Sequence, residues 1–473
     1  MAKQRYEMDM CRGPLAGKIL MFSLPLMLSG VLQLLFNAAD LAVVGRYAGD
    51  QALAAVGSTG ALTNLIVNAF IGLSIGANVL VARLYGAGER EKIGRAVHTA
   101  VSLSLVCGCI LVVVGVILAR PLLEWMDTPA DVIDLSVVYM RIIFCGMPVS
   151  MLYNFGAAIL RSMGDTKRPL YFLVAAGVLN VILNLFFVIV FKMDVDGVAL
   201  ATVISQAVSA ALIMICLMRM DGPCRVELRR LRIHRETAWE IMRIGLPAGL
   251  QGCVFSISNV LIQSSINSFD SLAMAGNTAA GNIEGFIYTA MNSVYQAALS
   301  FTSQNLGAKQ YRRINRVFGV CMILVTAVGL ALGLIAMLLQ KPLLHIYTDQ
   351  EPVVEFGMLR MNVIVTTYFL CGLMDVCSGM MRGLGYSVLP MIVSLTGACG
   401  LRVLWIYTIF ANHRTLTTLY LSYPVSWAIT FAAHLLCYWI ARRRLPAENE
   451  PLPPETAPEQ SPEPLKDEAA VIG

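Results

Sequence analysis

Charged side chains are scarce in this sequence. Asp, Glu, Lys and Arg make up 14% of the 473 residues, while apolar residues reach 57%. A soluble domain has about 25% charged residues. The apolar residues gather in runs of roughly 18–25 residues, each long enough to cross a hydrocarbon layer of about 30 Å. These features exclude an ordinary soluble domain and predict an all-α integral membrane protein.

Motifs typical of enzymes and ATP-driven machines are also missing. There is no Walker A loop, no HExxH and no GxSxG, so neither ATP nor a catalytic centre is indicated. The 5 histidines are scattered, and the 12 cysteines lie mostly inside apolar runs without the spacing of a zinc site. Basic residues occupy loops and form no basic domain that would bind nucleic acid. We expect a protein that is not an enzyme and that has no metal site and no organic cofactor.

Apolar runs predict about twelve transmembrane helices. They are 17–43, 53–80, 95–118, 134–160, 170–191, 196–218, 238–264, 275–301, 316–339, 356–381, 389–411 and 416–440. The loops between them alternate between basic and acidic composition, for example Arg83 to Arg95 against Glu124 to Asp134. The positive-inside rule then puts both termini in the cytoplasm of a multi-pass inner-membrane protein.

The two halves of the sequence repeat each other. LYGAGEREKIGRAV resembles NLGAKQYRRINRVF, which places Gly86 and Gly307 221 positions apart (307 − 86). RSMGDTKRP and RGLGYSVLP give the same offset for Arg161 and Arg382 (382 − 161). A six-helix unit is even, so its copies share one orientation about an axis along the membrane normal. This pattern predicts two pseudosymmetric six-helix bundles around a central cleft, an arrangement suited to alternating-access transport.

The repeat divides the chain into four parts. We predict an N-terminal lobe at 1–218, a basic cytoplasmic linker at 219–237 and a C-terminal lobe at 238–441. Residues 442–473 are rich in Pro and Glu and are predicted to form a disordered tail, because they cannot bury apolar surface.

Polar residues inside the first six spans form one candidate site. An Asp at mid-bilayer costs on the order of 2.5–3.5 kcal/mol on insertion scales, so it needs a partner, a water-filled cavity or protonation. Asp40 shares a helix face with two amides, and further polar residues occupy the fifth and sixth spans: Gln33, Asn37, Asn180, Asn184, Thr202 and Gln206. Pro25 lies in the helix of Asp40, where it could mark a bend. The alternative is an Asp40 hydrated at the outer interface beside Arg46.

The second half carries its own charges. Glu284 and Tyr288 share a face of the eighth span, Asn259 and Gln263 lie on the seventh, and Asp375 is on the tenth. Arg402 lies inside an apolar run and is expected to need Glu284 or Asp375 as its partner. The pair could be structural or could contact substrate, and the residues leave both options open.

The chain resembles the multidrug and toxic compound extrusion (MATE) family over roughly residues 12–441. The segments that carry the resemblance are SLP at the first helix, FNAADLAVVGRYAG, LYGAGE, AILRSMGDTKRP, NVILN with GVALATVISQ, RGLG and LRVLWIY. The resemblance implies two six-helix lobes forming a V, and export of organic, often cationic, compounds in exchange for H⁺ or Na⁺. A flippase for a lipid-linked precursor, from the same superfamily, is the alternative.

The resemblance also implies site residues. A cation-coupling site maps onto Asp40, Asn180 and Thr202, and Pro25 becomes a hinge. Asn184 departs from the family, which commonly has Asp there, so one negative charge is lost and coupling to H⁺ through Asp40 is favoured over Na⁺. Gln33, Asn37, Gln206 and the polar residues of the second half are predicted to contact substrate. The expected partners are a small-molecule substrate and the lipid bilayer, for a monomeric protein.

Overall fold

The computed structural model describes residues 6–126, 128–446 and 449, and this part of the chain is almost wholly helical. Within it, nine helices are long and apolar enough to span a membrane. Two bent pairs each form one more span: α4 (Ile133–Cys145) with α5 (Met147–Ser162), and α12 (Glu351–Ile364) with α13 (Phe369–Gly383). The remaining long helix, α9 (Ser271–Gly307), has 37 residues and many polar side chains. The predicted all-α membrane fold is therefore confirmed.

The first half of the chain forms α1 to α7, which we call the N-terminal lobe. Besides α4 and α5, its elements are α1 (Leu15–Val43) with the π-helical turn η1 (Val44–Ala48), α2 (Asp50–Ala87), α3 (Arg90–Trp125), α6 (Lys167–Leu185) with η2 (Phe186–Val190), and α7 (Val195–Arg219). The helices continue past the predicted apolar runs. For example, α2 ends where Gly88 adopts a left-handed conformation with a φ of 72°, which a glycine accepts without strain.

The second half forms α8 to α16, which we call the C-terminal lobe. Besides α9, α12 and α13, its elements are α8 (Arg235–Asn267), α10 (Tyr311–Leu338), α11 (Gln340–His345), η4 (Val365–Thr367), α14 (Val388–Ser394), η5 (Leu395–Gly400), α15 (Leu401–Trp405), η6 (Ile406–Phe410) and α16 (Leu416–Arg443). Because α16 continues to Arg443, the predicted tail does not begin at 442. Most of that tail, 447–448 and 450–473, lies outside the described residues.

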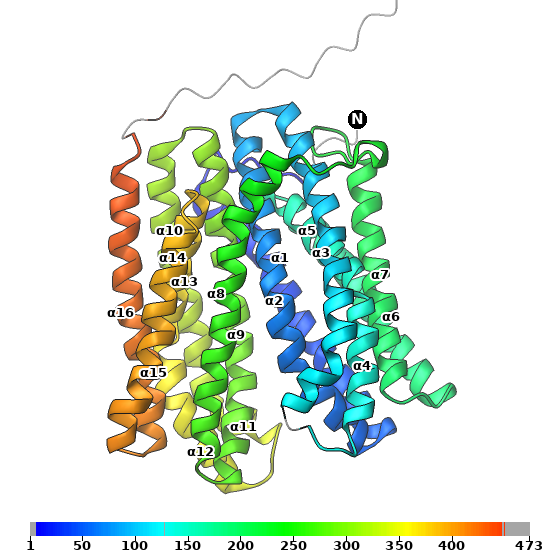
Figure 1. The fold of residues 1–473 in the computed structure, drawn as a ribbon. Helices are drawn as coiled ribbons and strands as arrows, with labels where there is room; N and C mark the ends of the chain where they lie inside the picture. Colours follow the sequence, from blue (N-terminus) through cyan, green and yellow to red (C-terminus); the bar gives the residue numbers. More distant parts are fainter. Residues whose placement is uncertain (1–5, 127, 447–448, 450–473) are drawn as a thin grey trace, which may run out of the picture.

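The two lobes stand side by side with their helices roughly parallel (Figure 1). The segment between α7 and α8 contains the short turn η3 (Leu228–Arg230) and lies at the end of the bundle where α16 also ends. We call this end the terminal face. The chain segment before α1 lies at the same face.

Glycines bring the lobes into close contact from the middle of the bundle to the terminal face. A Cβ atom on Gly72 of α2 would lie 2.2 Å from the backbone nitrogen of Gly249 in α8, and one on Gly86 would lie 1.9 Å from the carbonyl oxygen of Gln304 in α9. Nearby, the hydroxyl of Ser300 donates a hydrogen bond of 3.1 Å to Asn78 across the same contact. Larger side chains at these glycines would force the helices apart.

The segment before α1 crosses the contact between the lobes. The backbone N–H of Met8 donates to the carbonyl oxygen of Met163 in the N-terminal lobe at 3.2 Å. Two residues later, the N–H of Met10 donates to Oε1 of Gln304 at 3.1 Å, and its carbonyl oxygen accepts from Nε of Arg313 at 3.0 Å. Met10 is fully buried. The segment therefore ties the lobes together at the terminal face.

Helix α1 contacts both lobes. Ile19 and Phe22 in its first half are fully buried in a core cluster formed mainly by the C-terminal lobe. The Phe22 ring meets that of Phe301 in α9 edge to face, with 5.6 Å between centroids. The second half of α1 carries the polar residues Gln33, Asn37 and Asp40. This placement makes α9 a wall of the site inside the N-terminal lobe.

Candidate substrate and cation-coupling site

A polar cavity of about 290 Å³ lies within the N-terminal lobe and is closed on one side by α9. Its wall from α1 carries the predicted stripe of Gln33, Asn37 and Asp40. Helix α7 supplies Thr202 and Gln206. Apolar side chains and Arg161 also line the cavity, together with neutral amides and hydroxyls from α5, α6 and α9: Ser150, Asn154, Asn180, Thr289, Asn292, Ser293 and Gln296. Such a surface can hydrogen-bond ligands of varied shape.

The four residues predicted to couple transport to a cation form one hydrogen-bonded chain. Nδ2 of Asn184 donates to Oδ1 of Asp40 at 2.5 Å and lies 3.4 Å from Oδ1 of Asn180. Nδ2 of Asn180 in turn lies 3.4 Å from the hydroxyl of Thr202. The two Asn residues are buried, whereas Asp40 is half-buried and lines the cavity. The structure thus brings together the four side chains that the resemblance implied, and their role in cation coupling stays a prediction.

This cluster contains one buried oxygen atom that no donor among the described residues satisfies. Oδ1 of Asn184 is buried and has no hydrogen-bond partner among the described residues. The carboxylate of Asp40 receives its hydrogen bond from neutral Asn184, and within the described part of the chain no cationic side chain forms an ion pair with it. Arg46, the neighbour considered from the sequence, is exposed. A buried acceptor without a donor is uncommon in folded proteins and leaves room here for a proton or a cation.

Pro25 lies in the middle of α1, which continues through it as one helix. The proline is buried, and its carbonyl oxygen accepts a hydrogen bond of 2.8 Å from the hydroxyl of Ser29. Proline removes one backbone hydrogen bond of the helix. The bending expected at Pro25 stays a prediction.

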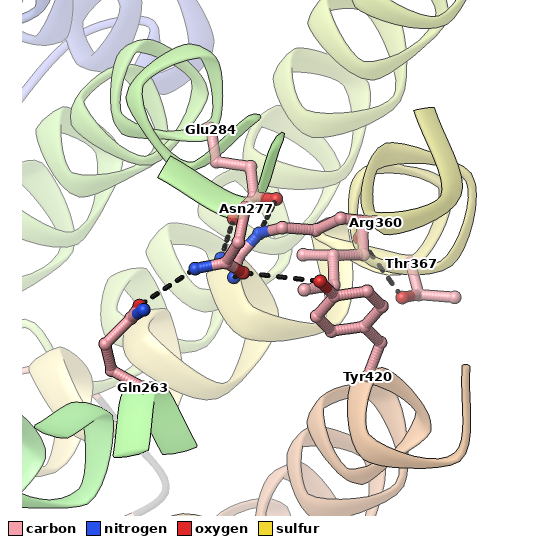
Figure 2. A network of polar contacts seen from close by, with 7 residues as sticks. Gln263, Asn277, Glu284, Arg360, Thr367 and Tyr420 are labelled. Atoms are coloured by element: carbon pink, nitrogen blue, oxygen red, sulfur yellow. Dashed lines mark hydrogen bonds and ion pairs between the residues drawn. The ribbon is translucent and has the colours of Figure 1, made fainter. Parts of the chain in front are cut away.

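The C-terminal lobe holds a buried ion pair within a network of polar side chains (Figure 2). The guanidinium of Arg360 in α12 donates two hydrogen bonds to the carboxylate of Glu284 in α9, from Nε to Oε1 at 2.8 Å and from Nη2 to Oε2 at 2.6 Å. Nη1 of Arg360 donates to Oδ1 of Asn277, whose Nδ2 donates to Oε1 of Gln263 at 2.9 Å. This two-point geometry is the strong form of a charged hydrogen bond. The network thus binds α8, α9 and α12 together.

The predicted partners of Arg402 are wrong. Glu284 pairs with Arg360, and within the described residues no carboxylate forms an ion pair with Arg402. Its Nε donates to the hydroxyl of Ser426 at 3.0 Å, and its guanidinium carbon lies 4.3 Å from the ring centroid of Tyr423. Trp427 offers a second ring at 5.6 Å. Aromatic faces attract a cation, and burying them costs less desolvation energy than burying a carboxylate. The rings can therefore accommodate the buried charge without an acid.

Two segments of the chain, residues 25–186 and 247–408, match the same protein-family model, MatE. The chain belongs to the MatE family. The starts of the two segments are 222 positions apart (247 − 25), as are their ends (408 − 186). The two matches therefore fall on the two copies of the internal repeat.

Relatives and solved structures agree with this MatE assignment. The chain is 27% identical over 420 residues to the Probable multidrug resistance protein YoeA of Bacillus subtilis, covering 87% of this chain and 90% of the relative. It is 25% identical to a FAD transporter of Shewanella oneidensis, covering 75% and 79%. The structure resembles an outward-facing multidrug resistance MATE family transporter with a TM-score of 0.87 at 22% identity, covering 93% and 99%. A transporter of the same superfamily from Pyrococcus furiosus has a TM-score of 0.86 at 23% identity, covering 92% and 97%.

The MatE fold separates the residues predicted to contact substrate. Gln33, Asn37 and Gln206 line the N-terminal cavity. The predicted residues of the C-terminal lobe do not line it. Among them, Gln263 and Glu284 belong to the ion-pair network, Tyr288 and Asn259 are exposed, and Asp375 is half-buried.

Sequence reasoning missed two arginines of this MatE protein. Arg360 is buried inside the span 351–383, and Arg161 lines the N-terminal cavity from the end of α5. Arg360 interrupts an apolar run much as Arg402 does, so the same signal could have found it. Arg161 had been noticed as part of the repeated RSMGDTKRP motif, but its position in the cavity required the structure.

Proposed function

We propose that this MatE transporter exports small organic compounds in exchange for protons, and that Asp40 carries the exchanged proton. Among the described residues, Asp40 is the only acidic side chain that lines the cavity. Its hydrogen-bond partner, Asn184, is neutral. A carboxylate in such a site is stabilised either by binding a proton or by binding a cationic ligand. Competition between the two for one group is what exchange requires.

Exchange must be linked to a change of shape. In this structure the lobes are in close contact from the middle of the bundle to the terminal face. Protonation of Asp40 removes the charge that holds a cationic compound and changes the hydrogen bonds between α1 and α6. Pro25 is the position where α1 would bend in response. A proton then favours one of two conformations because it binds them with different affinity.

We propose H⁺ rather than Na⁺ as the coupling ion. The oxygens near Asp40 belong to Asn180, Asn184 and Thr202, which are neutral. A Na⁺ ion bound there would need these neutral oxygens as ligands in addition to the single carboxylate. A proton needs only the carboxylate. The names of the relatives support a drug or an organic molecule as cargo, and none of those reported above names a lipid-linked precursor. We place the protein in the plasma membrane as a monomer, with both termini cytoplasmic.

Gradient-driven transport tests the proposal. The purified protein is reconstituted into liposomes, and uptake of ethidium is followed under an imposed pH gradient or an imposed Na⁺ gradient of equal size. The proposal predicts that the pH gradient alone drives uptake. Uptake driven by Na⁺ alone, or by neither gradient, would contradict proton exchange. Asp134→Asn is a suitable control variant, because Asp134 is exposed and pairs with Arg120 on the surface.

A further inference from the structure

The positive charge of Arg161 has no ion-pair partner among the described residues. It lies at the end of α5 and lines the N-terminal cavity. Its Nε is fully buried without a hydrogen bond, and within the described residues no side chain or carbonyl oxygen bonds its guanidinium. The residue as a whole is half-buried, and a donor that is buried without an acceptor is costly to a protein. A cavity with such a group at its wall is suited to a ligand that brings the missing anion.

The repeat provides a direct comparison, because Arg382 occupies the same position of the second unit. Nη1 of Arg382 donates to the hydroxyl of Tyr295 at 2.6 Å, and Nη2 donates to Oε1 of Gln251 at 2.7 Å. The guanidinium carbon also lies 6.0 Å from the centroid of the Tyr295 ring. Both Nη atoms of Arg382 are therefore held by side chains of its own lobe, while its Nε, like that of Arg161, has no hydrogen-bond partner among the described residues.

Both of these partners are absent from the first unit. Gly86 and Gly307 relate α2 to α9 by 221 positions, and subtracting 221 from Tyr295 leads to Ser74. The two prolines of α1 and α8, Pro25 and Pro247, are 222 positions apart, and subtracting 222 from Gln251 leads to Ser29.

The two serines cannot replace those partners. The hydroxyl of Ser29 donates to its own helix at 2.8 Å, and that of Ser74 does the same at 2.7 Å. Both side chains are also too short to reach as far as a Gln or a Tyr. The first unit thus has the arginine but not the Tyr and Gln side chains that bind the Nη atoms of Arg382.

Arg161 and Asp40 lie at opposite ends of the cavity. Arg161 is at the end of α5, close to the start of α6. Tyr153, also in α5, donates a hydrogen bond of 3.2 Å to the carbonyl oxygen of Pro169 in α6. Asp40 is linked through Asn184 to Asn180, further along α6. Pro169 and Asn180 both line the cavity, and the helix between them rises about 16 Å. One end of the cavity is therefore anionic and the other is cationic.

We propose that Arg161 binds an anionic group of the exported compound, so that the cavity takes amphoteric organic molecules. A cationic group lies toward Asp40, and a carboxylate or another anionic group lies on Arg161. The assignment rests on the proposed function, because it takes this cavity as the site of the exported compound. It adds a specificity that a lone Asp40 does not give, since a purely cationic molecule leaves Arg161 unpaired.

Two dyes that differ in one ester test the assignment. Rhodamine 110 has a free carboxylate and a cationic ring system, and rhodamine 123 is its methyl ester. Binding of each dye to the purified full-length protein is measured by fluorescence polarisation at neutral pH, without any gradient. The readout is the ratio of the two dissociation constants. Arg161→Gln is expected to shift this ratio against rhodamine 110 by about tenfold or more, the loss of one hydrogen-bonded charge pair.

A second variant keeps the arginine but gives it a partner. Ser29→Gln places at the cavity wall the amide that Gln251 gives to Arg382, and it should shift the ratio in the same direction. Arg95→Gln, an exposed arginine outside the cavity, is the control and should not move it. An unchanged ratio in a folded Arg161→Gln protein would overturn the assignment. If that variant does not fold, an unchanged ratio in Ser29→Gln overturns it equally.

The proposed function can fail separately. Uptake of rhodamine 123 under a pH gradient tests proton-coupled export and does not require a free carboxylate. If that uptake is absent while the binding ratio responds to Arg161→Gln, the export proposal is wrong and the anion site stands. If uptake is present while the ratio does not respond, only the anion site is wrong.

Discussion

The two lobes share one repeated unit but differ in how they satisfy a few particular charged groups. In the C-terminal lobe, Glu284 and Arg360 satisfy each other, and Arg382 is held by two side chains. In the N-terminal lobe, Asp40 and Arg161 lie at the ends of a cavity without a charged partner. Unsatisfied buried groups are rare in natural proteins and gather at functional sites. This difference underlies our proposal that the cavity of the N-terminal lobe binds the exported compound, while the ion-pair network of the C-terminal lobe supports the fold.

Removing the carboxylate of Asp40 from the N-terminal cavity should give the largest effect on transport. Asp40→Asn keeps an acceptor for Asn184 but cannot exchange a proton. We expect uptake driven by a pH gradient to fall to the rate of protein-free liposomes, while the thermal unfolding midpoint stays the same or rises, because no partner loses a charge. Normal uptake by the variant would contradict the role of Asp40.

The matching change in the C-terminal lobe should affect stability first. Arg360→Met leaves Glu284 buried and unpaired, and breaking a buried pair in this way costs about 3–5 kcal/mol of unfolding free energy. Unfolding of the purified protein in detergent by denaturant measures the effect. The double variant Glu284→Gln, Arg360→Met is the control and should lose less, because no charge is left unpaired. A single variant as stable as the parent would show that the network is not a structural support.

The pair of repeated arginines allows the same comparison at equivalent positions. Arg382→Gln leaves the hydroxyl of Tyr295 and the amide of Gln251 without their buried partner, which should cost about 1–3 kcal/mol. Arg161→Gln removes a charge that has no protein partner, so stability should be unchanged or higher. The measurement is again the free energy of unfolding. Equal losses in both variants would mean that Arg161 is as well satisfied as Arg382.

The smallest expected effect concerns Arg402. Arg402→Lys keeps the charge but replaces the flat guanidinium that lies over Tyr423. Stacking of this kind contributes about 0.5–2 kcal/mol and is weaker for an ammonium group. A loss of unfolding free energy within that range, with proton-driven uptake preserved, would confirm a packing role. A loss of transport at unchanged stability would instead show that Arg402 takes part in transport.

Most of the fold could be predicted from the sequence because a bilayer allows few solutions. Each apolar run has to be a helix, and the fixed offset between Gly86 and Gly307 shows the duplication directly. The stripe of Gln33, Asn37 and Asp40 was found for a related reason, since residues on one helix face must point the same way. Bends such as the one between α4 and α5, and the length of α9 beyond the membrane, were outside the reach of an apolar pattern.

The partners of buried charges could not be predicted in the same way. Glu284 and Arg360 are 76 positions apart (360 − 284) and meet only because of how α9 and α12 are rotated. Arg402 was expected to need an acid, and aromatic rings serve in its place. The open state of Arg161 depends on serines in two other helices. An alignment of the two halves could have shown this, but only once the partners of Arg382 were known.

Proton release on substrate binding tests the central claim most directly. The purified protein is held in weak buffer with a pH-sensitive dye, and ethidium is added without any membrane gradient. If a cationic compound and a proton compete for Asp40, about one proton should be released per bound cation at a pH where Asp40 is protonated, and Asp40→Asn should release none. Equal release by the parent protein and the variant, or binding by the parent without release, would contradict proton exchange at Asp40.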